Sequence, residues 1–184
     1  MSLLAKQQTW YDFYKDRVNS SYQDKFEKKY KPFLDKIISL GVTNIIDMGC
    51  GIGSVSKALH KRGIECLLID KDEDMIHLSI ENNSEWITLD NILVRNLAKI
   101  NYPAFENDFC ITHGVLEHYQ DTAIWRFIDL MPYSIHYVPL DKWITPSFGD
   151  ERLLSKEHWI DLVEPKEWGT FNDEKDLWFL IDKR

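Results

Sequence analysis

The sequence has no long apolar run, few cysteines and a deficit of positive charge, and each shortage excludes a class of protein. No stretch is apolar enough for the core of a signal peptide or for a membrane-spanning helix. The three cysteines form no Cys-x-x-Cys pair of the kind used in zinc and redox sites, so we expect reduced thiols and no metal site. A net charge of −8 argues against a nucleic-acid partner, because such partners require many Lys and Arg side chains at the phosphates. We therefore expect a soluble, cytoplasmic protein with no membrane or nucleic-acid partner; the sequence indicates no particular oligomeric state.

What the sequence does contain is enough apolar material for one folded domain. The 184 residues are 44% hydrophobic, which is typical of a single globular unit spanning 1–184. Apolar residues fall at helical spacing between Trp10 and Ile38, and Asn19 to Ser21 are expected to separate two helices there. Pro32 is expected to start or kink a segment, because it lacks a donor N–H and restricts Lys31 before it. We divide the domain into an N-terminal helical cap, 1–40, and a core, 41–184.

Beyond residue 41, short β-prone runs alternate with segments of helical periodicity. Strands are expected at 44–48, 64–69, 92–95, 108–113 and 135–138, and helices at 54–62, 72–81, 122–130 and 153–163. Two further strands, 167–171 and 177–182, would form a hairpin. Because parallel strands need helical crossovers of this kind, the pattern predicts a doubly wound, mostly parallel seven-stranded α/β sheet. Helices would cover both faces, an antiparallel hairpin would end the chain, and the N-terminal helices would form a lid.

A glycine-rich loop follows the first expected strand. Asp47 lies near the end of that strand, and Gly49, Gly51 and Gly53 come next at alternate positions. Glycines allow the backbone to pass close to a ligand, and the N–H groups that open the following helix can face it. A glycine-rich turn alone is often no more than a tight turn, so a binding role requires a second feature.

Asp70, at the end of the second expected strand, provides that feature. Its carboxylate can accept hydrogen bonds from both hydroxyls of a ribose lying on the glycine loop. The alternative is that Asp70 caps the helix that is expected to begin near Asp72. Its position at the carboxyl end of a strand, beside the glycine loop, favours the ribose.

These motifs resemble those of the class I S-adenosylmethionine-dependent methyltransferases, and the resemblance covers about residues 43–140. Residues 45–53, Ile-Ile-Asp-Met-Gly-Cys-Gly-Ile-Gly, resemble the first motif of the family, and residues 67–70 resemble its acidic second motif. Residues 108–118 resemble the fourth strand and following helix of the family, and they end in Val-Leu-Glu-His, which is frequent among members that act on small molecules. The resemblance implies a Rossmann-like fold with S-adenosylmethionine as cofactor. Nicotinamide enzymes prefer Gly-x-Gly-x-x-Gly, which would require glycine where this chain has Ser54.

The resemblance also implies where the cofactor would lie. The expected cofactor residues are Asp47, Gly49, Cys50, Gly51, Gly53, Asp70, Lys71, Met75, Asn96, Leu97 and His113. Asn96 stands where similar enzymes often have an Asp for the adenine amino group, and an amide oxygen can accept the same bond. Met75 at helical spacing is equally consistent with a core residue.

The expected catalytic residue is His113, because it ends the fourth strand, where ligands gather in open α/β sheets. The expected substrate-binding residues are Trp10, Tyr11, Tyr14, Tyr22 and His118. The aromatic residues of this set either form the lid or pack against the sheet, and His118, like Glu117, serves either the pocket or local hydrogen bonding. Residues 146–152 are expected to shape the acceptor pocket.

The predicted function is S-adenosylmethionine-dependent methyl transfer to a small-molecule acceptor by direct in-line displacement, leaving S-adenosylhomocysteine. Residues 112–115, Thr-His-Gly-Val, occupy the place of the Asn/Asp-Pro-Pro-Tyr motif found in enzymes that methylate planar amides and base amino groups. A small metabolite is therefore the acceptor that we expect. Two alternatives stay open: a non-catalytic S-adenosylmethionine-binding sensor or partner subunit, and an NAD-dependent oxidoreductase, which the glycine spacing disfavours.

Overall fold

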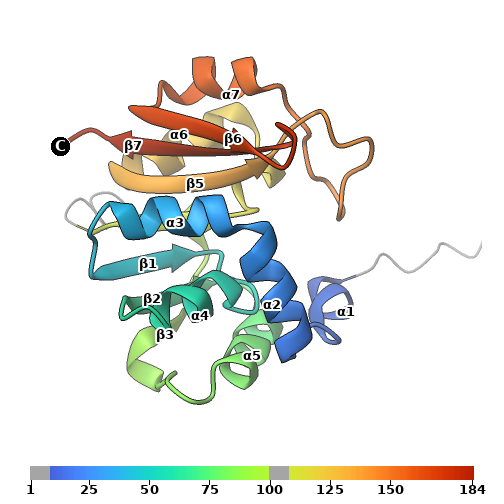
Figure 1. Cartoon of the computed structure of the whole chain (residues 1–184), viewed down its shortest axis with the longest axis vertical. Helices are drawn as coiled ribbons and strands as arrows, with labels where there is room; N and C mark the ends of the chain where they lie inside the picture. The colour runs from blue at the N-terminus through green and yellow to red at the C-terminus, as the bar shows by residue number, and fades with distance from the viewer. Residues whose placement is uncertain (1–8, 100–107) are drawn as a thin grey trace, which may run out of the picture.

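The computed structural model describes residues 9–99 and 108–184 and is built on a seven-stranded sheet (Figure 1). The strands are β1 (Asn44–Met48), β2 (Glu65–Asp70), β3 (Ile92–Val94), β4 (Cys110–His113), β5 (Tyr133–Pro139), β6 (Glu167–Phe171) and β7 (Asp176–Asp182). Their order is β3-β2-β1-β4-β5-β7-β6. The first five are parallel, whereas β7 is antiparallel to both β5 and β6. The mostly parallel sheet with an antiparallel C-terminal hairpin is thus confirmed. The part of the expected cap at residues 1–8 lies outside the described residues.

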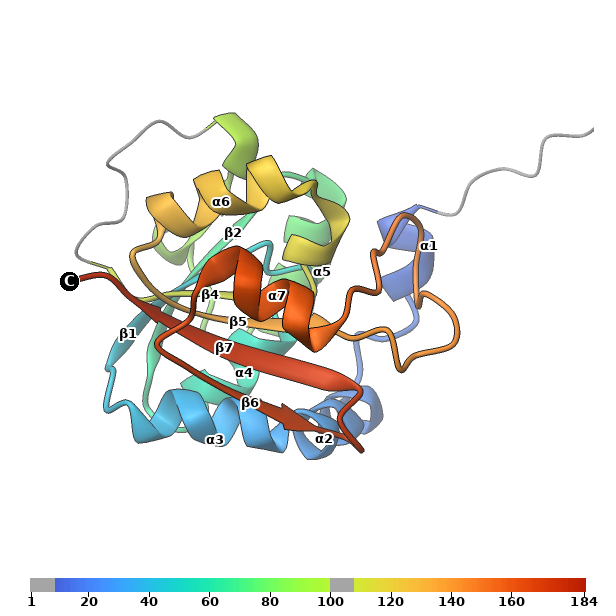
Figure 2. The same ribbon diagram turned by 90° about the horizontal axis from the view of Figure 1, so that it is seen from above.

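Helices cover both faces of this sheet, as Figure 2 shows. The helices are α1 (Trp10–Tyr14), α2 (Ser20–Lys29), α3 (Lys31–Ser39), α4 (Ser54–His60), α5 (Glu73–Asn82), α6 (Asp121–Leu130) and α7 (Lys156–Val163). Helices α2, α3 and α4 bury apolar side chains against one face, and α6 and α7 do so against the other. In the described part of the chain, no helix combines the length and apolarity needed to cross a membrane.

The central strands carry apolar side chains on both faces because both faces are buried. Successive side chains of β1 point to opposite faces, so Ile45 packs with the α3 side and Ile46 with the α6 side. Both isoleucines are less than a tenth exposed. This two-sided burial explains the continuous apolar runs from which the parallel sheet was predicted.

The sequence predicted a break at Asn19 to Ser21 and a segment that starts or bends at Pro32, and the structure has three helices here, with α3 beginning beside Pro32. The first break is where it was expected: Asn19 caps α2 by accepting a hydrogen bond from the Tyr22 N–H at 2.9 Å. A second break at Tyr30 separates α2 from α3. Pro32 lies in the first turn of α3, where its missing N–H leaves no bond unmade, so a new helix can begin there.

The last helix also begins later than predicted, at Lys156 instead of Leu153. Ser155 is its N-cap and accepts a hydrogen bond from the His158 N–H at 3.1 Å. Leu154 instead forms an isolated bridge with Leu140, which ties the end of the 140–155 loop to the residue after β5. The helix was predicted to start too early because Leu153 and Leu154 fit the helical spacing of apolar residues, and this spacing does not reveal the cap at Ser155.

The carboxyl ends of the parallel strands position the cavity described below. Because β1, β2, β4 and β5 are parallel, their carboxyl ends lie together. The 49–53 loop follows β1 at this edge, and the 140–155 loop follows β5. Helix α1 lies beyond the same edge, beside the 140–155 loop (Figures 1 and 2).

A buried polar cluster under α6 and α7 has a clear protonation state. His136 is fully buried in β5, with Nδ1 2.8 Å from Thr112 Oγ1 and Nε2 2.7 Å from Ser134 Oγ. Ser134 donates its hydroxyl hydrogen to the Met131 carbonyl at 2.6 Å, so Nε2 carries a hydrogen and donates to Ser134 Oγ. Burial lowers the pKa of His136 to about 3, so the ring is neutral near pH 7 and Nδ1 accepts the Thr112 hydroxyl.

This lowered pKa predicts a loss of stability in mild acid. Between about pH 6.5 and pH 3 the unfolded chain binds a proton at His136 that the folded chain does not, so the free energy of unfolding decreases as the pH decreases. The substitution His136→Gln removes this pH-dependent contribution to the free energy of unfolding. Urea denaturation should show that the free-energy difference between wild type and variant shrinks by about 2 kcal/mol from pH 7 to pH 5. A difference that is constant with pH would contradict the prediction.

Candidate functional site

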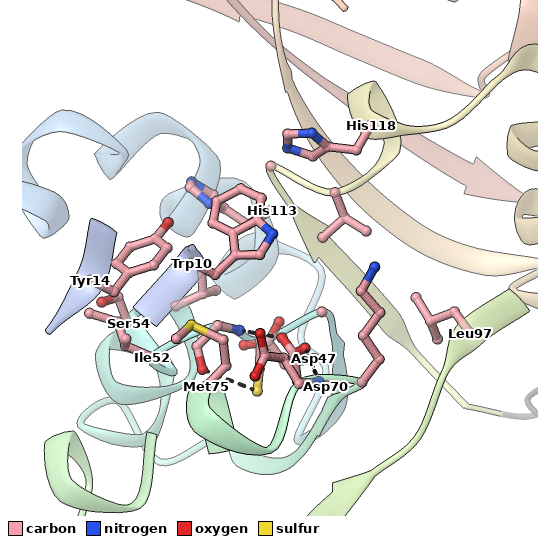
Figure 3. A pocket seen from close by; sticks show the side chains of 18 of the residues that line it. Trp10, Tyr14, Asp47, Ile52, Ser54, Asp70, Met75, Leu97, His113 and His118 are labelled. Atoms are coloured by element: carbon pink, nitrogen blue, oxygen red, sulfur yellow. Dashed lines mark hydrogen bonds between the residues drawn. The ribbon is translucent and has the colours of Figure 1, made fainter. Parts of the chain in front are cut away.

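A cavity of about 240 Å³ lies at the carboxyl edge of the sheet (Figure 3). Asp47, Asp70 and Met75 lie close together at its base, with Trp10 beside them and Leu97 on the opposite side (Figure 3). These residues come from α1, the ends of β1 and β2, α5 and the turn after β3. The topology thus gathers residues from most of the chain around one space.

The glycine loop between β1 and α4 forms part of the cavity wall. The N–H groups of Gly49 and Cys50 both donate to the Ile69 carbonyl of β2, at 2.7 and 3.0 Å. Gly51 has a φ of +54°, and a Cβ added to it would meet no atom within 4 Å. Gly53 differs, because its Cβ would lie 2.6 Å from Asn83 Nδ2 and 2.7 Å from Ser79 Oγ. Gly51 therefore leaves room at the cavity, whereas Gly53 allows α4 and α5 to approach each other.

Asp70 connects the end of β2 to this loop. One carboxylate oxygen accepts the Gly51 N–H at 2.9 Å, and the other accepts the Asp72 N–H at 3.0 Å. Burial raises the pKa of Asp70, and the backbone hydrogen bonds oppose that effect. The N-cap of α5 is Asp72, which accepts the Asp74 N–H at 2.9 Å. The alternative reading of Asp70 as the cap of this helix is therefore wrong.

Asp47 lies near Asp70 and is 1% exposed. Its carboxyl accepts a hydrogen bond from the Ser56 hydroxyl at 2.6 Å, and this bond links the end of β1 to α4. Burial raises the pKa of Asp47 to about 7, and the nearby Asp70 carboxylate adds to this. Asp47 therefore changes charge near neutral pH.

His113 ends β4 among aromatic rings. It stacks on Tyr137 with centroids 4.3 Å apart, and it contacts the edge of Tyr30 and the ring of Phe26. Its Nε2 is buried and has no hydrogen-bond partner in the described part of the chain. Burial lowers the pKa of His113 to about 3, so the ring is neutral at physiological pH and is a weak base. The predicted catalytic residue thus borders the cavity in an environment that disfavours taking up a proton.

Aromatic contacts close the outer end of the cavity. The Trp10 ring packs on Phe148 of the 140–155 loop, with centroids 4.0 Å apart. The edge of the His118 ring meets Trp10 at 5.3 Å, and His118 Nδ1 lies 2.8 Å from Asp150 Oδ1. Trp10, Phe148, His118 and Asp150 are referred to below as the mouth cluster. Helix α1 and a loop far away in sequence therefore meet over the site.

Most of the predicted site residues line this cavity. They are Asp47, Gly49, Cys50, Gly51, Asp70, Lys71, Met75, Leu97, His113, Trp10, Tyr14 and His118. Four others, all in described segments, lie elsewhere: Gly53, Asn96, Tyr11 and Tyr22. Asn96 uses its side-chain oxygen to accept the Ala98 N–H at 2.9 Å, Tyr11 is 42% exposed, and Tyr22 packs against the apolar cluster beneath α1.

The structure adds lining residues that the sequence reasoning did not name. They are Phe26, Ile52, Ser54, Val55, Asp72, Arg95, Gly114, Val115, Tyr119 and Asp150. Asp150 belongs to the 146–152 segment that was expected to shape the acceptor pocket. Val115 lies so near Gly49 that an added Cβ there would be 2.6 Å from its Cγ2. This contact joins two motifs that are far apart in sequence, and only the fold reveals it.

The fold is that of a doubly wound α/β protein, with a cavity at the carboxyl edge of its parallel strands. Residues 46–128 match the family model described as a methyltransferase domain. Over these residues the chain is similar to a methyltransferase domain, in agreement with the resemblance that the motifs carry, and its fold is Rossmann-like. No curated protein sequence gives a significant match to the chain.

Solved structures share this fold at low sequence identity. The PH0226 protein of Pyrococcus horikoshii OT3 has a TM-score of 0.73 and 16% identity, over 94% of this chain and 99% of that one. Magnesium protoporphyrin IX methyltransferase of Synechocystis PCC 6803, with bound S-adenosylhomocysteine, has a TM-score of 0.62 and 15% identity, over 92% of this chain and 99% of that one. Human N-acetylserotonin methyltransferase, in complex with S-adenosylmethionine, has a TM-score of 0.60 and 11% identity, over 98% of this chain and 61% of that one.

The raised pKa of Asp47 predicts a pH-dependent effect of Asp47→Asn. The folded chain binds a proton at Asp47 between about pH 4 and pH 7 that the unfolded chain has lost, so this residue's contribution to stability disappears as the pH rises through about 7. Asparagine remains neutral throughout. Urea denaturation should therefore show Asp47→Asn gaining stability relative to wild type from pH 5 to pH 8. The control is Asp24→Asn on the exposed side of α2; an equal pH trend in both variants would contradict the assignment.

Proposed function

We propose that this chain transfers the methyl group of S-adenosylmethionine to a small-molecule acceptor. The observation that carries the proposal is the joint placement of Asp70 and the glycine loop. Asp70 accepts the Gly51 N–H while also lining the cavity, and Gly51 leaves the adjacent space open. A carboxylate at the end of β2 beside an open glycine loop suits a ligand that carries a ribose.

The residues around the cavity fit this cofactor. The backbone at Gly49 and Gly51 would lie along its methionine part, Asp70 would accept hydrogen bonds from the ribose hydroxyls, and Leu97 would border the adenine. Ser54 Oγ and His113 Nε2 are buried without partners among the described residues, and both residues line the cavity. Buried polar atoms normally have a partner, so a polar ligand would supply what these two lack.

The protein's own contribution would be alignment and the exclusion of water. When bound, the cofactor supplies a sulfonium methyl group that is already reactive towards a nucleophile. Trp10, which lines the cavity and packs on Phe148, would keep bulk water away from the acceptor. The glycine loop, fixed by Ile69 and Asp70, would hold the cofactor in one position relative to the mouth cluster.

A small molecule is the acceptor that best suits the site and the surface. The cavity is bounded by side chains on several sides, including Trp10, whose ring packs on Phe148. The net charge of −8 disfavours a nucleic-acid acceptor. The same geometry would serve a non-catalytic sensor that binds the cofactor, so catalysis has to be tested by turnover.

The proposal predicts selective binding and turnover. Isothermal titration calorimetry should show saturable binding of S-adenosylmethionine and S-adenosylhomocysteine but none of NAD. Each of the two ligands should also raise the melting temperature, because it binds only the folded state. Incubation with S-adenosylmethionine and a panel of hydroxyl, amine, thiol and carboxylate metabolites should release S-adenosylhomocysteine for at least one acceptor. Binding without release would support the sensor, and binding of NAD alone would refute the proposal.

A second prediction concerns Asp70. Losing charged hydrogen bonds should weaken S-adenosylhomocysteine at least about tenfold in Asp70→Ala, and less in Asp70→Asn, which keeps one acceptor oxygen. Because Asp70 also holds Gly51, a ribose contact has to be separated from loop support. The 2′-deoxy analogue of S-adenosylhomocysteine should bind wild type more weakly than the parent compound does, and Asp70→Ala should distinguish the two compounds much less.

The matched control is Ser155→Ala, which removes the N-cap of α7 away from the cavity. This variant should lose about 1 kcal/mol of stability while keeping wild-type affinity. If Asp70→Ala discriminates between the parent compound and its deoxy analogue as strongly as wild type does, Asp70 supports the loop without contacting the ribose.

A further inference from the structure

His118 and Asp150 of the mouth cluster form a histidine–carboxylate pair. The Nδ1 atom of His118 lies 2.8 Å from Asp150 Oδ1, and both residues line the cavity. The hydrogen bond from His118 lowers the pKa of Asp150, so that carboxylate is ionised and can only accept. Nδ1 must therefore carry the hydrogen of this bond. In the neutral ring the lone pair is then on Nε2, which makes no hydrogen bond to a described residue.

We propose that His118 is the proton acceptor for a phenolic hydroxyl acceptor, and that Asp150 is the positioning residue that fixes its tautomer. The inference rests on the function proposed above and names its acceptor class. The acceptor O–H gives its proton to Nε2 of His118, an oxygen lone pair forms the new bond to the methyl carbon, and the electron pair of the broken carbon–sulfur bond stays on sulfur. Charge and atoms balance, since the sulfonium becomes a neutral thioether and His118 becomes an imidazolium.

The contrast with His113 supports this choice of residue. His113 is enclosed by Phe26, Tyr30 and Tyr137, and its depressed pKa makes it a weak base. His118 instead has a carboxylate on one nitrogen, which stabilises the imidazolium that forms when the other nitrogen takes a proton. Of the histidines that line the cavity, His118 therefore has the environment that a base requires.

The walls near His118 favour a planar acceptor. The edge of the His118 ring meets the Trp10 ring, Trp10 stacks on Tyr14 at 6.1 Å, and Tyr119 also lines the cavity. Aromatic walls bind flat rings through offset and edge contacts. A phenol combines a flat ring with a hydroxyl that stays protonated near neutral pH, as the tyrosine side chain does, so it both fits the walls and requires a base.

Asp150 fixes geometry and adds little stability. Its side chain is 80% exposed, whereas that of His118 is 14% exposed, and exposed ion pairs contribute little to folding. A structural role for the pair is therefore weak. Its effect is to orient the ring and to determine which nitrogen has the free lone pair.

Two phenols separate proton removal from binding. At about pH 8 the hydroxyl of 4-nitrophenol is mostly ionised and needs no base, whereas that of 4-methylphenol is protonated. Wild type should methylate both. His118→Gln should lower kcat on 4-methylphenol by at least about 100-fold, the usual size of a general-base contribution, and kcat on 4-nitrophenol by less than about tenfold. Asp150→Asn should give an intermediate loss on 4-methylphenol only.

The matched control is His158→Gln. His158 also faces a carboxylate, with Nε2 3.2 Å from Asp121 Oδ2, but it lies outside the cavity. This variant should keep both rates. Equal losses on the two phenols in His118→Gln, or no loss on either, would overturn the role of His118. Failure of wild type to methylate either phenol would overturn the acceptor class; S-adenosylhomocysteine release with the amine, thiol or carboxylate panel would then show that methyl transfer itself still holds.

A spectroscopic measurement tests the pair without turnover. Nitrogen-15 NMR of the ligand-free protein should show neutral His118 as the Nδ1–H tautomer in wild type, and a mixture of tautomers in Asp150→Asn. An Nε2–H tautomer in wild type would overturn the proposal, because Nε2 would then have no lone pair to accept the proton.

Discussion

The structure of the site depends on how the end of β2 holds the loop after β1. The Ile69 carbonyl accepts two consecutive N–H groups of that loop, and the Asp70 carboxylate accepts a third, from Gly51. These bonds hold the glycine loop in one conformation, although its glycines have no side chains that could pack against the fold. Every other feature is placed relative to it: α4 begins where the loop ends, Asp47 is sealed beneath it, and Val115 closes against Gly49.

Sequence periodicity and turn chemistry were sufficient to predict the sheet, because each central strand is buried on both faces and reads as an apolar run. The glycine loop and Asp70 were predictable for a related reason, since adjacent parallel strands bring their carboxyl ends together. Asn96 shows the limit of this reasoning. Its side chain caps a local turn and does not line the cavity, whereas Leu97, which was also predicted, and Arg95, which was not, do line it. Local hydrogen bonds of this kind leave no periodic signal. The sequence could predict Asp150 only as part of the 146–152 segment, because its partner His118 is 32 residues away along the chain.

Burial separates the two histidines that border the cavity. Both come from the region around β4. The sequence favoured His113 as the catalytic residue because it ends the strand. In the fold the same position encloses it between α2 and β5, where an added charge is costly, and its nitrogen is left without a partner. His118 lies five residues further, past the end of the strand, where a loop from β5 supplies a carboxylate. A strand end therefore places a side chain near a ligand, but the elements packed around it decide which chemistry it can perform.

The contact between Trp10 and Phe148 has a consequence for the order of events at the site. Helix α1 is five residues long and buries none of its residues fully, and the loop that carries Phe148 has no regular structure near that ring. Such elements sit at the low end of the range of local unfolding free energies, whereas the glycine loop is tied to the central sheet. We therefore expect ligands to enter and leave by local opening of the contact between α1 and this loop, while the glycine loop stays folded. For the proposed enzyme, the rate of this opening would set an upper limit on turnover that is independent of the chemical step.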